Sequence, residues 1–367
     1  MSMALRIAAE GKGATFPNPA VGAIIAKNRR IIGCGYHPKA GFPHAEIYAL
    51  QQAGTQAKNA TLFITLEPCC HYGKTPPCVS AIINAGIKNV SIATADPNPI
   101  IHKQGIAALI NAGITVTCGI LEQEAQFLNR DYFTFHMKKR PYVRMKFAMT
   151  LDGKIASSQK KSKWLSTEQT RYFTHRLRAL SDAILVGSQT IIHDNPQLDV
   201  RINRKHEHLF YRIILDPLLE TPPASNLFKV PLPVLLFAQH ALNKNNKICY
   251  PENCEIIPLP VKNNLFDLHS IMNTLHKKNI QSILVEGGAA TISNFLEKNL
   301  ADELYVIISP HIMGGSASLN FAAFLKERLL DSMISLSLQK IFTINKDIII
   351  QYTNTLFSKN SMQSDRG

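Results

Sequence analysis

Long hydrophobic runs are absent from this sequence. Apolar stretches such as residues 282–285 and 348–350 are only a few residues long, whereas a membrane-spanning helix needs about 20. Residues 1–13 form a short amphipathic segment without the extended apolar region of a secretory signal. We therefore expect a cytoplasmic protein that does not interact with a membrane.

A disulfide framework is also missing. The seven cysteines are odd in number and unevenly spaced, and the chain of 367 residues is long enough for two domains that each bury a core. Cys34, Cys118, Cys249 and Cys254 lie in or near apolar, strand-like stretches. We predict that these four are buried small apolar side chains, and that other cysteines bind a metal.

Concentrated positive charge is lacking, although the net charge is +14. Residues 1–140 carry 14 Lys and Arg against 7 Asp and Glu, and the remainder carries 26 against 19, so that each part has a charge of +7. There is no basic tail and no aromatic RNA-binding motif. A positive field spread in this way suits small phosphorylated ligands at least as well as a polyanion.

The dinucleotide-binding motif G-x-G-x-x-G follows none of the predicted strands, so an ordinary Rossmann site is not supported. Residues 286–290 read Glu-Gly-Gly-Ala-Ala between a predicted strand and a predicted helix. Glycines in such a turn let the backbone approach a phosphate, and the helix N-terminus favours an anion. This is weak support for a phosphate site when taken alone.

Two short motifs supply three side chains of the kind that bind zinc. They are His44 in His-Ala-Glu and the two cysteines Cys69 and Cys78 of segment 68–78. An imidazole and two thiolates make three ligands of a tetrahedral zinc, and a catalytic zinc keeps its fourth position for water. Glu46 is the natural group to move protons on and off that water. His-x-Glu followed by Pro-Cys and a second Cys is the signature of zinc nucleobase deaminases.

The position of these residues on their elements matters. Residues two apart on a helix point about 200° from each other, so His44 and Glu46 can share a site only if His44 lies at the helix entrance. Its place after Gly-Phe-Pro fits that requirement. Cys78 is expected to open a helix at 79–85, where the helix dipole favours a thiolate. A closed structural site, with Cys70 or His71 as fourth ligand, is the alternative.

The first part of the chain alternates between helical and strand patterns. Two passages, 81–87 and 108–114, repeat a helix that stops at a glycine and leads into a β-rich run. We therefore predict a three-layer α/β sandwich. A basic run that ends at Pro141 marks the domain boundary. Predicted elements before it are helices at 3–9, 47–53 and 79–85 and strands at 21–26, 30–35 and 61–66.

The second part continues as a series of strands with helices between them. The segment 358–367 is polar and is expected to be frayed. The predicted strands cover 142–149, 183–187, 211–215, 234–237, 282–285, 304–308, 336–341 and 348–352, and the predicted helices cover 167–180 and 268–278.

Longer motifs resemble one enzyme family over nearly the whole chain, the bifunctional deaminase/reductases of riboflavin biosynthesis. Eight residues separate the two ligand cysteines, where most zinc nucleobase deaminases have two. The chain departs from the family at Cys70, where serine is common, and at Lys74, where many members have arginine. The segments that carry the resemblance are 17–22, 44–46, 67–78, 146–154, 163–165 and 286–288.

The resemblance implies a fold and two activities. Residues 1–140 are expected to form a cytidine-deaminase-like, zinc-dependent pyrimidine deaminase domain, and residues 141–357 a dihydrofolate-reductase-like, NADPH-dependent reductase domain. The implied reactions are hydrolytic deamination of 2,5-diamino-6-(5-phosphoribosylamino)pyrimidin-4-one and then NADPH reduction of the ribosyl side chain to ribityl. The expected partners are small phosphoribosyl pyrimidines, without nucleic acid, and the chain is expected to form a homo-oligomer.

The resemblance also assigns roles to individual residues. The implied catalytic residues are Glu46, Lys146 and Glu286, and the zinc ligands are His44, Cys69 and Cys78. The substrate residues are Asn18, His71, Lys74, Ser162, Arg178, Leu198, Arg201 and Glu286. The NADPH residues are Ala148, Trp164, Thr190, Asp194, Gly288, Ala289, Ala290, Thr291, Ile292, Ser293 and Asn294.

Two other interpretations stay open from the residues themselves. One is a nucleic-acid-acting zinc deaminase whose C-terminal half is a binding module; the long ligand loop and the spread charge count against it. The other is a scaffold protein in which zinc is a structural clip. Glu46 beside a three-ligand site argues against a clip.

Overall fold

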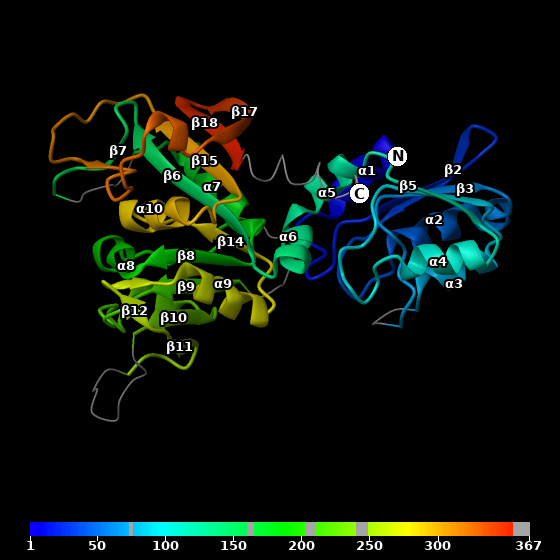
Figure 1. Cartoon of the computed structure of the whole chain (residues 1–367), viewed down its shortest axis with the longest axis horizontal. Helices are drawn as coiled ribbons and strands as arrows, with labels where there is room; N and C mark the ends of the chain where they lie inside the picture. Colours follow the sequence, from blue (N-terminus) through cyan, green and yellow to red (C-terminus); the bar gives the residue numbers. More distant parts are fainter. Residues whose placement is uncertain (73–75, 160–164, 203–209, 240–248, 355–367) are drawn as a thin grey trace. The chain divides into compact units, whose positions relative to one another are not determined.

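The computed structural model describes residues 1–72, 76–159, 165–202, 210–239 and 249–354, and the chain divides into two compact units, 1–140 and 141–367 (Figure 1). Lys74, Ser162, Trp164 and the tail 358–367 lie outside the described residues. None of the described helices is long and apolar enough to cross a membrane.

A five-stranded sheet forms the centre of the first unit, in the order β2-β1-β3-β4-β5. Strand β1 is antiparallel to both β2 and β3, while β3, β4 and β5 are parallel. The strands are β1 (Gly22–Lys27), β2 (Arg30–Tyr36), β3 (Thr61–Ile64), β4 (Asn89–Ile92) and β5 (Thr115–Cys118).

Helices cover both faces of this sheet (Figure 1). Helices α2, α3 and α4 pack on the face that carries Ala23, Ile25 and Leu62, and α1 lies on the other face, against Gly22. The predicted three-layer sandwich is therefore confirmed. The helices are α1 (Ser2–Ala8), α2 (Ala45–Ala53), α3 (Cys78–Asn84), α4 (Gln104–Asn111), α5 (Glu122–Leu128) and α6 (Arg130–Lys138).

Small residues bring helix α2 close to the sheet. Ala45 and Ala49 are fully buried, and a Cβ added at Gly35 of β2 would lie 2.5 Å from the Ala45 carbonyl oxygen. A larger residue at these positions would push the helix away, because packed interiors leave no spare volume. The close approach fixes the N-terminus of α2, which carries His44 and Glu46.

The second unit is built on a nine-stranded sheet, in the order β11-β10-β9-β8-β14-β6-β15-β18-β17. Neighbours from β11 to β15 are parallel, and β18 and β17 add an antiparallel edge. These strands are β6 (Tyr142–Thr150), β8 (Ala183–Gly187), β9 (Tyr211–Leu215), β10 (Val234–Ala238), β11 (Cys254–Pro258), β14 (Ser282–Val285), β15 (Glu303–Ser309), β17 (Leu336–Ile344) and β18 (Asp347–Asn354).

Four helices cover the two faces of the second sheet. Helices α9 (Leu268–Lys277) and α10 (Ala289–Glu297) pack on one face, and α7 (Glu168–Ala179) and α8 (Ser188–Asp194) on the other. Strand β14 returns between β8 and β6, so the chain winds in opposite directions on its two sides. Ligands of open α/β sheets bind beyond the carboxyl ends of the strands at such a switch point. Two small sheets pair β7 (Lys154–Ala156) with β16 (Leu319–Asn320) and β12 (Val261–Lys262) with β13 (Leu265–Phe266).

The predicted burial of four cysteines was wrong. Cys118 and Cys249 are exposed, and Cys34 and Cys254 are only half-buried. Cys118 ends β5, which is an edge strand with a neighbour on one side only. An apolar sequence pattern does not distinguish such an edge from a central strand.

Candidate functional site

His44, Cys69 and Cys78 come together in the first unit. The Nδ1 atom of His44 lies 3.5 Å from Cys69 Sγ and 3.3 Å from Cys78 Sγ. All three atoms lie within 4.8 Å of one another. A sulfur and a nitrogen bound to one tetrahedral zinc are about 3.5 Å apart, given Zn–S of about 2.3 Å and Zn–N of about 2.0 Å. The three side chains therefore fit a zinc ion without rearrangement.

Each ligand is delivered by the end of a secondary-structure element. His44 is the N-cap residue of α2, in an extended backbone conformation, which confirms the predicted helix entrance. Cys78 is the first residue of α3. Its backbone N–H donates to Cys69 Sγ at 3.3 Å, and the N–H of Val79 donates to the Cys69 carbonyl oxygen at 3.2 Å. The N-terminus of α3 thus holds Cys69 as well as supplying Cys78.

Without a cation, the two thiols share a single negative charge. Hydrogen bonding with Cys78 and His44, against the opposing effect of burial, lowers the pKa of the Cys69 thiol to about 4, whereas the hydrogen bond with Cys69 and burial raise the pKa of the Cys78 thiol. Thiolate is the form of cysteine that binds metals.

Glu46 lies next to the trio in the first turn of α2 and is 2% exposed. Burial raises the pKa of its carboxyl to about 7. Among the residues that the structure describes, its Oε2 atom is buried and has no hydrogen-bond partner. A buried carboxylate oxygen without a partner is costly, which is explained if a water or ligand meets it in the working enzyme.

Asn18 and His71 have different surroundings. Asn18 is half-buried, and its Nδ2 lies 3.1 Å from Nε2 of His37, whose Nδ1 lies 3.1 Å from the Pro43 carbonyl oxygen. The ring of His37 in turn stands edge-on to that of His44, with centroids 5.1 Å apart. Asn18 is therefore tied to the trio through His37, which sequence reasoning missed. His71 is exposed.

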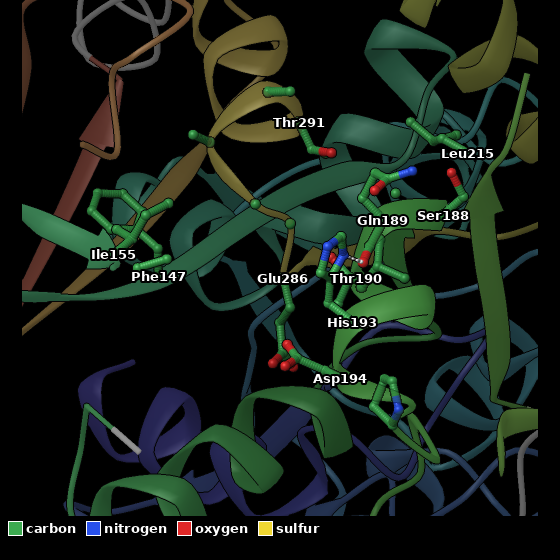
Figure 2. Close-up of a pocket in the computed structure, with 18 of the residues that line it drawn as sticks. Phe147, Ile155, Ser188, Gln189, Thr190, His193, Asp194, Leu215, Glu286 and Thr291 are labelled. Atoms are coloured by element: carbon green, nitrogen blue, oxygen red, sulfur yellow. Dashed lines mark hydrogen bonds between the residues drawn. The ribbon is translucent and has the colours of Figure 1, made fainter. Parts of the chain in front are cut away.

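A cavity of about 1150 Å³ opens in the second unit at the carboxyl ends of β8, β9 and β14, and residues 146–148 within β6 also line it. Figure 2 shows that its lining comes from several elements: Phe147 from β6, Ile155 from β7, Thr190 and Asp194 from α8, Glu286 after β14 and Thr291 from α10. The predicted residues that line it are Lys146, Ala148, Arg178, Thr190, Asp194, Leu198, Arg201, Glu286, Gly288, Ala289, Ala290, Thr291 and Asn294.

Arg178 and Glu286 form a paired contact in this cavity. Arg178 Nε donates to Glu286 Oε1 at 2.6 Å and Nη2 donates to Oε2 at 3.1 Å. Burial alone would raise the pKa of Glu286, but the Arg178 guanidinium and the Lys146 ammonium hold it below the ordinary value. Burial also lowers the pKa of Lys146, against the attraction of Glu286. The three groups form one charged network.

The second predicted arginine is placed differently. The Arg201 side chain is 62% exposed, and its Nε lies 3.2 Å from Asp199 Oδ1. Its backbone N–H donates to Nδ1 of His175 at 3.1 Å. Leu198, the residue before Asp199, is buried and has a positive φ of 52°, a strained conformation for a bulky side chain. Segment 198–201 therefore has an uncommon backbone conformation where Leu198 and Arg201 line the cavity.

The turn after β14 fits a phosphate-bearing cofactor. Gly288 is the N-cap residue of α10, whose first turn has no acidic residue. A Cβ added at Gly288 would meet no described atom within 4 Å, so the backbone is open towards the cavity. Ile292 and Ser293 do not line the cavity and are buried, because helical periodicity turns them towards the core.

Several cavity residues were missed from sequence. His175 lies on the same helix as Arg178, three residues earlier, and an i, i+3 spacing places both on one face. That signal was available. Gln189 and His193 also line the cavity; His193 Nδ1 lies 2.8 Å from the Gln189 carbonyl oxygen (Figure 2). They belong to α8, which the strand pattern did not predict.

Comparison with known protein families divides the chain at the same place as its fold. Residues 1–94 match the cytidine and deoxycytidylate deaminase zinc-binding region, and residues 141–350 match the RibD C-terminal domain. These matches confirm the expected fold class, a cytidine-deaminase-like unit followed by a reductase-type unit.

Curated relatives and solved structures match over most of the chain. The riboflavin biosynthesis protein RibD of Aquifex aeolicus is 41% identical over 351 residues, which are 95% of this chain and 96% of that protein. The RibD protein of Escherichia coli is 36% identical and covers 86% of this chain and 88% of its own length.

Two solved structures superpose closely. Acinetobacter baumannii RibD has a TM-score of 0.85 at 33% identity, covering 96% of this chain and 97% of its own. A Thermotoga maritima diaminohydroxyphosphoribosylaminopyrimidine deaminase/5-amino-6-(5-phosphoribosylamino)uracil reductase has a TM-score of 0.84 at 35% identity, with the same coverage. A chain that shares its sequence and fold with these proteins from end to end belongs to the RibD family of riboflavin biosynthesis enzymes.

Proposed function

We propose that this chain catalyses two successive steps of riboflavin biosynthesis. Residues 1–140 would deaminate 2,5-diamino-6-(5-phosphoribosylamino)pyrimidin-4-one hydrolytically, and residues 141–357 would reduce the ribosyl side chain of the product to ribityl. The observation that carries the proposal is the trio of His44, Cys69 and Cys78 beside a buried Glu46 oxygen that has no hydrogen-bond partner in the described part of the chain.

The first step needs an activated water and a proton carrier. His44 Nδ1 and the two cysteine Sγ atoms would hold a zinc ion, which as a Lewis acid lowers the pKa of water to about 7. Glu46 Oε2 would take a proton from the attacking water and return it to the departing amino group, so that ammonia leaves. The half-buried Asn18 is the proposed contact for the pyrimidine edge, and His71 and Lys74 for the rest of the substrate.

The second step needs positioning. NADPH supplies a hydride when it is bound, and the proposed contacts are the Gly288–Asn294 turn, Ala148, Thr190 and Asp194, with Trp164. The chain must then align the opened ribose carbon with the cofactor, since hydride transfer depends mainly on orientation. Glu286 and Lys146 both line the cavity, and their opposite charges attract; we propose that they move the accompanying proton.

The two arginines have separate proposed roles. Arg178 donates to both Glu286 oxygens and, through Nη1, to the Asp199 carbonyl oxygen at 2.9 Å, so it holds the acid in place. Arg201 is largely exposed and is the better candidate for the substrate phosphate, for which a guanidinium is well suited. Leu198 and Ser162 complete the proposed substrate side.

A nucleic-acid-acting deaminase with a binding module is not favoured, because residues 141–350 match a reductase domain. The proposal includes small-molecule substrates, a cytoplasmic location and a homo-oligomer. Each of these goes beyond the family assignment.

A two-stage assay tests the function on the purified full-length chain. Ammonia release from the diaminopyrimidinone ribosyl phosphate is followed first without cofactor, and the absorbance of NADPH is followed after its addition. Ammonia first and NADPH oxidation second are expected. Absence of ammonia from zinc-loaded protein contradicts the deaminase assignment, and ammonia without later oxidation contradicts the reductase assignment.

A further inference from the structure

Glu67 is a buried acid that the proposed mechanism does not use. It is 4% exposed and lies two residues before the ligand Cys69. Its Oε2 accepts hydrogen bonds from the backbone N–H groups of Asp96 and Lys103, both at 3.0 Å. Its Oε1 accepts from the N–H groups of Gly105 at 2.9 Å and Ile106 at 3.2 Å. One carboxylate therefore binds the start of a helix 36 to 39 positions away in the sequence.

That helix, α4, has no cap of its own. Its N-cap residue is Lys103, which has a left-handed conformation and makes no side-chain capping bond. The first N–H groups of a helix have no partner within it and need one from elsewhere. The N–H groups of Gly105 and Ile106 find that partner in Glu67. An anion at this end is also favoured by the helix dipole.

The contact extends from Glu67 to the peptide that carries Cys69. A Cβ added at Gly105 would lie 2.1 Å from the Pro68 carbonyl oxygen, so the backbone of α4 packs directly on the residue before the ligand. Pro68 has a fixed φ, and the N-terminus of α3 holds Cys69 from the other side. Cys69 is thus fixed between two helix N-termini, and Glu67 forms the link to one of them.

We propose that Glu67 is a positioning residue for the metal ligand Cys69. Its carboxylate fixes segment 67–69 against α4, so that Cys69 Sγ stays beside His44 Nδ1. The inference rests on the proposed zinc-dependent function. Residues that orient a metal ligand from outside typically contribute 10- to 100-fold to metal affinity. A simple helix cap would contribute to stability and leave the metal site unchanged.

The test compares Glu67→Gln with the wild-type full-length chain. Glutamine keeps the shape of the side chain, but its amide NH₂ opposes two backbone N–H donors. Zinc affinity is measured by competition with a chromophoric chelator, and cobalt is substituted to record the absorption bands that report thiolate geometry. We expect zinc to bind about 10- to 100-fold more weakly and the cobalt bands to shift, with Glu67→Asp recovering part of both.

Asp216→Asn is the matched control. Asp216 is a fully buried carboxylate of the second unit that accepts the N–H groups of Glu220 and Thr221 at 2.9 and 2.8 Å. The same chemical change there is expected to lower thermal stability and leave zinc affinity and the cobalt bands unchanged.

The proposal is overturned if Glu67→Gln is less stable but binds zinc within twofold of wild type with the same cobalt spectrum. If Glu67→Gln does not fold, Gly105→Ala, which disturbs the same contact from the helix side, and Glu67→Asp decide by the same criterion. A wild-type chain that does not bind zinc would instead contradict the proposed function itself.

Discussion

Arg178 donates two hydrogen bonds to Glu286, from Nε to Oε1 at 2.6 Å and from Nη2 to Oε2 at 3.1 Å, although the two residues are 108 positions apart in the sequence. Nη1 is bound as well, to the Asp199 carbonyl oxygen. A guanidinium committed in this way has little capacity left for a phosphate. Its geometry serves the orientation of Glu286, whose ionised form it also stabilises.

Glu286→Gln is therefore expected to lower reductase turnover. The change removes the negative charge that Lys146 and Arg178 share, and loss of a positioned acid–base group costs about 100-fold. NADPH oxidation with the deaminated substrate measures it, and ammonia release by the same preparation is the control. Full reductase turnover in this variant would remove Glu286 from the proton transfer.

Glu46→Gln is expected to abolish deamination and leave the second unit unaffected. The amide cannot accept the proton of the attacking water, and the loss should reach about 100- to 10,000-fold. Ammonia release measures the effect. Zinc content should stay at the wild-type level, because Glu46 is not one of the three ligand side chains. Retained deamination would contradict its proposed role.

Gly288→Ala is expected to weaken NADPH binding without unfolding the protein. An added methyl meets no described atom within 4 Å, so it would project into the space proposed for the cofactor. Overfilling a packed site by one methyl costs about 1–3 kcal/mol, which raises the dissociation constant by about 5- to 150-fold. Cofactor fluorescence titration measures it.

Gly287→Ala is the contrasting variant for this turn. A Cβ there would lie 2.4 Å from Thr291 Cβ, so the substitution strains α10 itself. We expect a lower melting temperature in Gly287→Ala and a nearly unchanged one in Gly288→Ala. Unchanged NADPH affinity in Gly288→Ala would contradict the assignment of this turn to the cofactor.

His175 predicts a pH dependence of the second unit. Burial and the nearby Arg178 and Arg201 lower its pKa, against the opposite effects of Asp199 and Glu286. The unfolded chain then takes up this proton more readily than the folded one. The neutral form of His175 therefore contributes to the free energy of unfolding. This contribution is fully present above the ordinary pKa of about 6.5 and is lost as the pH falls through the lower pKa of His175 in the folded chain.

His175→Asn tests this dependence. Asparagine can keep an acceptor for the Arg201 N–H, which His175 Nδ1 accepts at 3.1 Å, but it does not titrate. Between pH 7 and pH 5 the wild-type second unit should lose more thermal stability than the variant. Parallel curves for the two proteins would show that His175 does not control this segment.

Local sequence patterns predicted the parts of the fold that local chemistry decides. His44 had to precede its helix to share a site with Glu46, and α2 does begin at Ala45. Glycines after two regular helical stretches marked the ends of α3 and α4. Most strands were found because their residues are buried and β-branched.

Long-range pairing is what the sequence could not reveal. Nothing near Glu67 indicates that its partners begin at Asp96, and nothing near Arg178 indicates Glu286, since each contact depends on how the sheets assemble. Cys118 illustrates the same limit, because edge and central strands share an apolar pattern. Many residues that the family resemblance assigns to the reductase site line the cavity, and the structure adds which of them already have partners, as Arg178 and Glu286 do.

Among the residues that the structure describes, the two sites share none, since the ligand trio and Glu46 belong to unit 1–140 and the residues that line the cavity lie between 146 and 324. A substitution in one site is therefore expected to leave the residues of the other site unchanged. If the deaminated intermediate is released by one polypeptide and reduced by another, a cell that carries one chain defective at Glu46 and a second chain defective at Glu286 should still make riboflavin. Genetically, the single gene would behave as two complementation groups.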